Sequence, residues 1–319
     1  MVSNSDFKKY ISNEGRSIGM AKTGDPLLGP FSQLPGEWSN GEDLKGRGWN
    51  MIALPFVKDG SRLNYRVLVN QYNETLNFTT VDTGVPNRGI KTAPLQNKDQ
   101  LIVTLDYKQI VTQMAADDFP ESGRLPPTPV AGIHHEPGLF LHMRNFPANG
   151  LNIARLGTVP HGDSLLALGK YSEAKRNSGG PKIPDVSALP IGGPSKDLEH
   201  PYLAPYKHYH DNPFKGIFDV TNPSDLLRKA TPASVKHTTT LHFSTNSLTG
   251  GIVNIPFIVK HANASEMEFT MWILETEDDV FIQYMQVVML DFFERSDNTP
   301  GQIQWPHISF NTIKRQKKQ

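Results

Sequence analysis

The stretch "SEMEFTMWILETEDDVFIQYMQVVMLDFFERSDNTPGQIQWPHISFNTIKR" (265–315) decides the fold, because apolar and polar residues alternate in successive runs along it. In its first run, apolar side chains at Met267, Phe269, Met271 and Ile273 alternate with polar ones. A period of two is typical of a β-strand with one buried face. The segments "TEDD" and "SDNTPG" between the runs are rich in turn-forming residues. Strands joined by short turns predict an antiparallel meander, which either stacks as a sandwich or closes as a barrel.

Runs of the same kind continue toward the N-terminus. They lie at 62–82, 99–115, 129–146, 150–171, 235–246 and 250–259. Within 62–82, Leu63, Tyr65, Val67 and Val69 share one face, whereas Leu76, Phe78 and Thr80 share the other. This change of face around Asn73 and Glu74 predicts a hairpin there. The whole chain is therefore expected to be all-β.

The domain organisation follows from the segments that lack such runs. Residues 1–24 are polar and predict a short N-terminal arm, and residues 25–319 predict a single β domain. Within it, residues 172–232 are rich in Pro and Gly and have no periodicity apart from a short helix at 222–230. A long aperiodic stretch with isolated aromatic residues predicts an insertion that wraps around the domain or forms a lid.

Composition excludes several classes of function. The 32 basic residues balance the 32 acidic ones, so the chain has no field for nucleic acid or an anionic membrane. Cysteine is absent, which excludes disulfides, thiolate metal sites and thiol nucleophiles. No apolar run resembles a signal peptide or reaches the ~20 residues of a membrane span, so a cytoplasmic protein is expected. The 11 histidines are the most available ligands for a transition metal. The oligomeric state is not encoded in any of these features.

Motif searches leave histidine as the only candidate for site chemistry. The sequence has no nucleophile elbow and no P-loop, and "HGDS" (161–164) has a spacing that seldom makes a triad. On a strand, His134 and Glu136 share one face, which is typical of a hydrogen-bonded pair or of a pocket-lining histidine. His161 lies at a turn, or at the rim of a cavity. No residue can be given a catalytic role on these grounds.

His307 has the most unusual setting of the histidines. By strand parity it shares a face with Trp305 and Ser309, and it follows Pro306. Proline inside a strand requires an edge, a bulge or a missing ladder bond. A bulge at Pro306 would aim His307 toward the interior.

Three stretches in this order resemble the nitrobindin-like haem-binding β-barrels, which share their shape with lipocalins and fatty-acid-binding proteins. They are "DPLLGPFSQLPGEWSNGEDLKGRGWN" (25–50), "GIHHEPGLFLHM" (132–143) with "PHGDSLLALG" (160–169), and "WPHISFNTIKR" (305–315). The chain is about twice as long as those barrels, and 172–232 has no counterpart in them.

The resemblance implies an antiparallel up-and-down β-barrel that binds haem b, with His307 as axial ligand of the iron. Trp305, Phe269 and Met271 would contact the macrocycle, and His134 and His161 would lie on the distal side or near the propionates. The implied chemistry is peroxidase-like, or concerns nitric oxide or peroxynitrite, with a small diatomic or peroxide as second ligand.

Two alternatives remain open at this level. The barrel could carry a small apolar ligand without metal, in which case His307 would not matter for binding. The protein could instead act through the 172–232 insertion as a docking segment, in which case the barrel would be filled.

Overall fold

The computed structural model describes residues 22–60, 62–92, 95–125, 130–159, 162–174 and 180–317. The predicted arm, 1–24, lies almost entirely outside these ranges. Of the described residues only Lys22, Thr23 and Gly24 belong to it, and Thr23 Oγ1 donates to the carbonyl of Pro35. The first element that follows is the 3₁₀ segment η1 (Pro26–Phe31).

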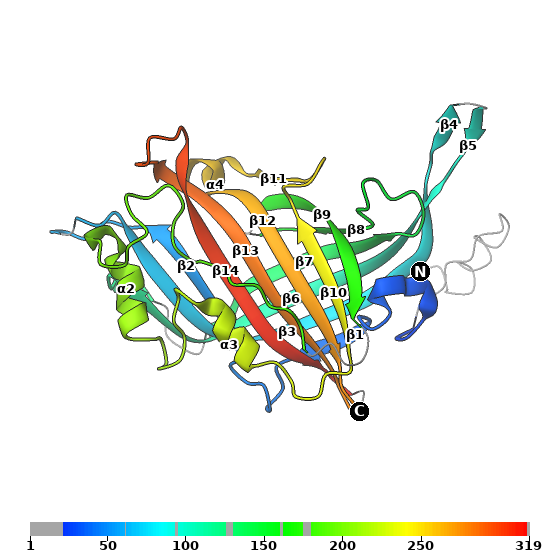
Figure 1. Cartoon of the computed structure of the whole chain (residues 1–319), viewed down its shortest axis with the longest axis horizontal. Helices are drawn as coiled ribbons and strands as arrows, with labels where there is room; N and C mark the ends of the chain where they lie inside the picture. The colour runs from blue at the N-terminus through cyan, green and yellow to red at the C-terminus, as the bar shows by residue number, and fades with distance from the viewer. Residues whose placement is uncertain are drawn as a thin grey trace.

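Across the described ranges, antiparallel strands form a closed barrel of 10 strands (Figure 1). Pairing of the last strand with the first long one, Ile308 to Met51, closes the ring. Neighbours in the barrel follow the chain order, so the predicted all-β, up-and-down barrel is confirmed. The ring consists of β2 (Gly48–Pro55), β3 (Tyr65–Asn87), β6 (Gln100–Phe119), β7 (Val130–Met143), β8 (Ile153–Gly157), β9 (Asp163–Ala174), β10 (His237–Ser244), β12 (Asn263–Glu275), β13 (Val280–Glu294) and β14 (Gln302–Arg315).

Shorter elements decorate this ring. The strand β1 (Gly36–Ser39) pairs with both β14 and β3, β4 (Ile90–Thr92) pairs with β5 (Leu95–Asn97), and β11 (Gly251–Asn254) pairs with β9. The helical elements are η2 (Pro201–Leu203), α2 (Ala204–Asp211), α3 (Pro223–Lys229) and α4 (Pro256–His261). The helix predicted at 222–230 is thus confirmed as α3.

The hairpin predicted around Asn73 and Glu74 is wrong, because β3 is one continuous strand of 23 residues. Even-numbered residues of β3 face the barrel interior along its length, from Leu68 to Phe78. The odd-numbered Tyr65 and Val67 in its first half are also fully buried, because another segment covers the outside of the barrel there. The change of apolar face in the sequence therefore marks the end of this outer cover rather than a turn.

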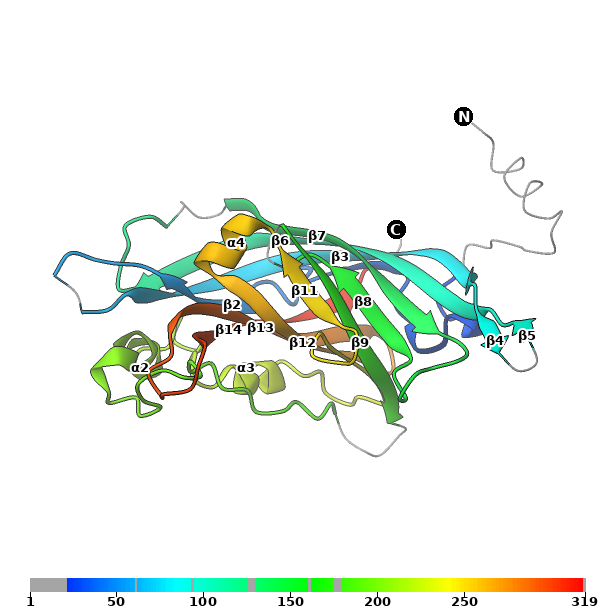
Figure 2. The same ribbon diagram turned by 90° about the horizontal axis from the view of Figure 1, so that it is seen from above.

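That cover is the 172–232 insertion. β9 continues to Ala174, and the described remainder packs against the outer faces of β2, β3, β13 and β14. Phe218 contacts Trp49 with ring centroids 5.5 Å apart, and Tyr202 contacts Tyr65 at 5.2 Å. Figure 2 shows α2 and α3 along this wall, on the side away from α4. The described part of the insertion therefore wraps the barrel, and it does not form the lid that the sequence left open.

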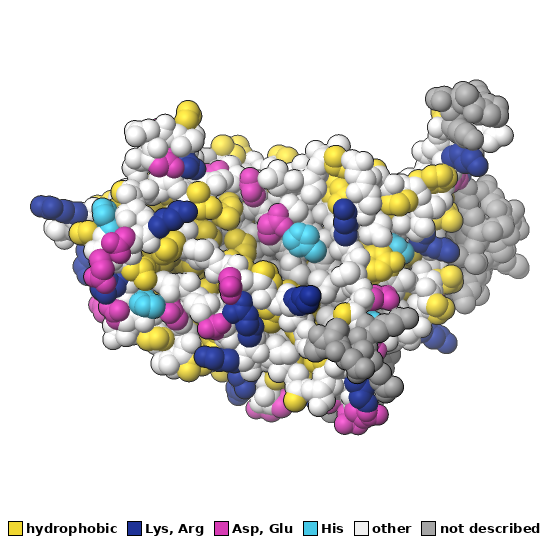
Figure 3. Space-filling view, viewed as in Figure 1, with side chains coloured by type: hydrophobic (Ala, Val, Ile, Leu, Met, Phe, Trp, Pro, Cys, Tyr) yellow, Lys and Arg dark blue, Asp and Glu magenta, His cyan; other side chains and the backbone are white. Residues whose placement is uncertain are grey.

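The surface over this wall carries charges of both signs. Figure 3 shows Lys and Arg side chains interspersed with Asp and Glu on the face where α2 and α3 lie. This agrees with the overall balance of charge in the sequence. No helix among the described residues is long and apolar enough to cross a membrane.

The barrel interior has a filled half and a hollow half. In the filled half, the ring of Phe140 contacts Phe78, Tyr107 and Phe243 at centroid distances between 5.2 and 5.4 Å. Phe31 of η1 packs against the same ring at 5.8 Å and closes this end. The other half holds the cavity described below.

Candidate functional site

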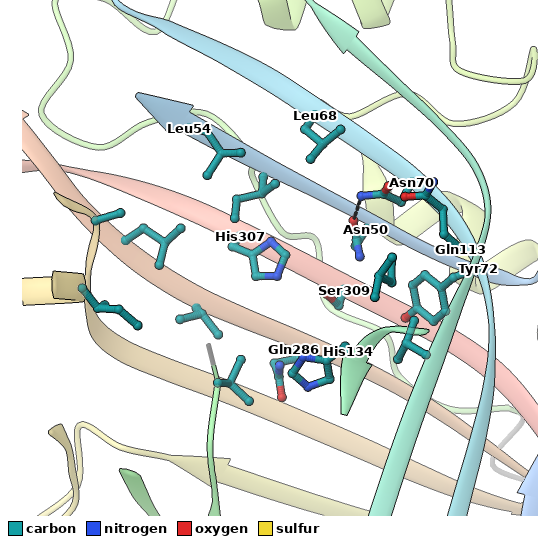
Figure 4. Close-up of a pocket in the computed structure, with 18 of the residues that line it drawn as sticks. Asn50, Leu54, Leu68, Asn70, Tyr72, Gln113, His134, Gln286, His307 and Ser309 are labelled. Carbon is teal, nitrogen blue, oxygen red and sulfur yellow. Dashed lines mark hydrogen bonds between the residues drawn. The ribbon is translucent and has the colours of Figure 1, made fainter. Parts of the chain in front are cut away.

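A cavity of about 530 Å³ occupies the hollow half of the barrel. This volume lies within the usual range for sites that bind small organic molecules. Apolar side chains from β2, β3, β6 and β13 form much of its wall: Ile52, Leu54, Leu68, Val111, Val288 and Leu290. A smaller number of polar side chains project into it, which Figure 4 shows together with part of the apolar wall.

His307 of β14 projects into this cavity (Figure 4). Its Nδ1 lies 2.9 Å from the backbone carbonyl oxygen of Met51 on the neighbouring strand β2. A carbonyl oxygen only accepts, so Nδ1 carries the proton and donates it. In the neutral ring Nε2 then keeps its lone pair, and it has no hydrogen-bond partner among the described residues. The imidazole is held in one tautomer with a free electron pair available to the cavity.

The protein environment also keeps this ring uncharged. Burial lowers the pKa of His307 to about 4, although the hydrogen bond to the Met51 carbonyl acts in the opposite direction. The part of the ring that solvent can touch faces the cavity, so the surrounding protein still removes most of its hydration. At neutral pH the ring is a neutral base.

The bulge expected at Pro306 is wrong, because β14 runs in register from Ile303 to Lys314. The register shift lies on β13, beside Phe293, which adopts a φ of 61°. Pro306 instead lies just beyond Ile308, the last residue of β14 that pairs with β2. Its missing N–H removes no ladder bond at that edge, and ordinary strand parity is enough to aim His307 inward.

A row of small polar side chains crosses the cavity wall beside His307. Ser309, Asn50 and Asn70 are direct cross-strand neighbours on β14, β2 and β3. Asn70 Nδ2 donates to Asn50 Oδ1 at 2.8 Å. Asn70 Oδ1 and the Nε2 of Gln113 on β6 are buried and have no hydrogen-bond partner among the described atoms. Unsatisfied amides at a cavity wall are groups that a bound ligand can satisfy.

A buried charged cluster lies beside this row. Glu136 of β7 is fully buried, and its Oε1 accepts from Arg155 Nη2 of β8 at 2.9 Å and from the hydroxyl of Tyr107. Burial alone would raise the pKa of Glu136, but the charge of Arg155 and the hydrogen bonds from His134 and Tyr107 together outweigh it and lower that pKa. His134 Nε2 lies 3.3 Å from Glu136 Oε2, so the predicted His–Glu pair is present, with His134 lining the cavity. The pair can orient the imidazole of His134.

The mouth of the cavity was not foreseen from the sequence. Phe257, Ile258 and His261 of α4 line it, together with Arg124 from the β6–β7 connection. α4 lies where "GGIVNIPFIV" predicted a strand; Pro256 ends the strand pattern and begins the helix instead. The proline after "NI" was the available signal.

The other predicted contact residues lie elsewhere in the fold. Trp305 is fully buried in an aromatic cluster, stacked on Phe292 at 4.8 Å and 4.5 Å from Tyr65, rather than lining the cavity. Phe269 and Met271 belong to the filled half, where the guanidinium of Arg155 lies 4.2 Å from the ring centroid of Phe269. His161 lies outside the described residues. Of the "HGDS" motif, Gly162 lies in a turn and Asp163 and Ser164 begin β9. Asp163 Oδ1 accepts from the Val159 amide.

Comparison with known proteins returned no relative: no family model, no curated protein and no solved structure matches this chain. Within the described part of the chain, no group of three or more His, Asp and Glu side chains could hold a bare metal ion.

Proposed function

We propose that this protein binds haem b in the barrel cavity, with His307 Nε2 as the axial ligand of the iron. The observation that carries the proposal is the single anchored imidazole: Nδ1 donates to the Met51 carbonyl and Nε2 faces the cavity. A backbone carbonyl is one of the groups that commonly accept from the second ring nitrogen of a metal-bound histidine and orient it. Haem needs only one such residue, because the macrocycle supplies the other ligands.

The other cavity residues fit the remaining parts of the haem group. The apolar wall suits the macrocycle and excludes water from it. The exposed Arg124 and His261 at the mouth suit the two propionates, because both carry or can take a positive charge. Arg124 and His261 would then hold the propionates at the mouth of the cavity.

The second proposed ligand is a small diatomic molecule or a peroxide. Bound haem iron supplies the site at which such a ligand attaches. The chain itself offers His134, oriented by Glu136, as a group that can give or take a proton. It also offers the unsatisfied amides of Asn70 and Gln113 as an acceptor and a donor. These groups favour peroxidase-like or peroxynitrite chemistry over simple storage.

Absorption spectroscopy tests the axial ligand. Purified protein mixed with haemin should develop a Soret band, and His307→Ala should lose it, whereas His142→Ala should keep it. His142 is a matched control because burial lowers its pKa too, but it packs against Phe31 outside the cavity. Added imidazole should restore the band in His307→Ala by entering the space that the side chain vacates.

The opposite results would end the proposal. A His307→Ala protein that binds haemin as tightly as the parent would show that another residue holds the iron, or that binding is unspecific. A folded parent protein with no Soret band would favour the metal-free carrier, which the apolar wall also suits. In that case a fluorescent fatty acid should bind in the cavity of the parent and of His307→Ala equally well. A docking role for 172–232 predicts a filled barrel, whereas this barrel contains a cavity.

A further inference from the structure

The barrel wall has a seam between the ends of β1 and β2. Both β1 and β2 lie between β14 and β3, end to end, with Ser39 paired to Thr75 and Gly48 paired to Tyr72. Among the described strands, none covers Asn73 and Glu74 of β3 on that side. A side pocket of about 130 Å³ opens there, with the exposed Gly41 and Thr75 at its rim. This is room enough for a few water molecules.

Glu74 lines this pocket and is only 3% exposed. Its Oε2 lies 2.6 Å from the hydroxyl of Tyr284 and accepts from Asn311 Nδ2 at 2.9 Å. Its Oε1 accepts from Gln109 Nε2 at 2.8 Å. The described contacts of Glu74 include no cation, in contrast to Glu136 with its arginine.

The missing cation decides the protonation state of Glu74. Burial raises its pKa, while the hydrogen bonds from Tyr284, Asn311 and Gln109 and the more distant charge of His134 lower it without cancelling that effect. Tyr72 and Tyr284, the other titratable groups facing it, stay neutral because burial raises their pKa values well above 10.0. Glu74 is therefore surrounded by neutral dipoles and holds its proton more strongly than an ordinary carboxyl group.

The same group connects the side pocket with the main cavity. Tyr284 OH lies 2.9 Å from Tyr72 OH, and both rings line the cavity floor. We propose that Glu74 and Tyr284 form a proton relay through the barrel wall, from water in the side pocket to the floor of the ligand cavity. This relay rests on the proposed haem function only in one respect, namely the reaction in the cavity that consumes the proton.

The hydrogen atoms balance along this path. When a base in the cavity takes the hydroxyl proton of Tyr284, Tyr284 takes the proton of Glu74 in the same step, so no tyrosinate forms. The carboxylate left behind accepts from Tyr284, Asn311 and Gln109. A water in the side pocket then reprotonates it. One proton enters at the pocket and one leaves at the floor, with no redox change.

Infrared spectroscopy of the haem-free protein tests the relay without reference to haem. At neutral pH the parent should show a carboxylic-acid C=O band that Glu74→Gln lacks. Transfer to D₂O should shift this band at once in the parent, in Thr75→Trp, which covers the side pocket, and in Tyr284→Phe, which cuts the inner route. Only the Thr75→Trp/Tyr284→Phe double variant should exchange as slowly as core amides.

Two outcomes would overturn the relay. Absence of the band from the parent-minus-Glu74→Gln spectrum would mean that Glu74 is ionised and holds no proton to deliver. Rapid exchange in the double variant would mean that Tyr284 is not the inner route. Haem binding, measured separately by its Soret band, can fail or succeed under either outcome, so the two proposals are distinguishable.

Discussion

At the scale of single residues, the site depends on how its polar atoms are paired. His307 has one ring nitrogen bonded and one free, Glu136 has a cation, and Glu74 has only neutral partners. These differences set three different proton affinities within one barrel. None of them follows from the residue types alone.

The pairing of His307 predicts a specific pH dependence. Its folded pKa of about 4 lies below the ordinary value of 6.5, so between these values the unfolded chain binds more protons than the folded one. The free energy of unfolding should therefore fall as the pH falls through this window, by at most about 3 kcal/mol. Urea unfolding of the haem-free protein at both ends of the window should show this loss. The free energy of unfolding of His307→Gln, whose side chain cannot titrate, should fall by correspondingly less over the same pH window. An equal fall in both proteins would show that burial does not lower the pKa of His307.

The unsatisfied amide of Gln113 predicts a conflict between stability and binding. Gln113→Leu should raise the free energy of unfolding by about 1 kcal/mol, because it removes a buried donor that has no partner. The same change should weaken binding of any ligand that uses the amide. Urea unfolding and a haemin titration measure the two effects.

Gln283 provides the matched control for Gln113. It is 0% exposed, and it bonds Leu227 O, Thr312 Oγ1 and Thr231 Oγ1, each at 3.0 Å. Gln283→Leu should therefore lower the free energy of unfolding by about 1–3 kcal/mol, since it leaves these groups unpaired. Equal effects of the two substitutions would show that Gln113 has a partner in solution.

At the scale of elements, the outer wrap formed by the insertion should contribute to stability as a core does. Phe218 is 0% exposed between the insertion and Trp49 of β2. Phe218→Ala should lower the free energy of unfolding by about 3–5 kcal/mol. Its neighbour Ile217 is 56% exposed, so Ile217→Ala should change it by no more than about 0.5 kcal/mol. A small effect of Phe218→Ala would show that the insertion is only loosely attached.

Elements also show where the sequence was informative. Period-two alternation identified most of the barrel strands, because successive side chains of a strand point to opposite faces of the barrel wall. On β3 the alternation was misleading, because the insertion buries the outer face of its first half as well. The resulting change of apolar face led to the wrong prediction of a hairpin. Contacts between segments more than 100 residues apart, such as Tyr65 with Tyr202, leave no local periodicity.

At the scale of the whole molecule, the site combines residues from strands far apart in the chain. Strand parity placed His307 on one face of its strand with Trp305 and Ser309, and its expected inward aim rested on a bulge that is absent. The structure nevertheless places His307 in the cavity. Its partner, the carbonyl of Met51, is 256 residues away and has no side-chain signature at all. Trp305 departs from the same parity rule because β14 separates from β2 beyond Ile308 and its ring joins the outer aromatic cluster.

Haem binding should stabilise the molecule as a whole. A ligand that binds only the folded barrel raises the free energy of unfolding by about 2.7 kcal/mol at a free concentration 100 times its Kd. Urea unfolding with haemin should show this gain in the parent and no gain in His307→Ala. A similar gain in both would indicate binding outside the cavity.

The insertion covers β14 and β2, and this affects which parts of the barrel open locally. These strands have buried side chains on their outer face at Trp49, Met51, Ile308 and Phe310, whereas β6 and β7 expose Lys108, Ile110 and His135 to solvent. Backbone amides of β14 should thus be among the last to exchange with deuterium, and those of β6 and β7 should exchange earlier. The wall that carries His307 would stay fixed while the opposite wall and α4 move apart to admit a ligand.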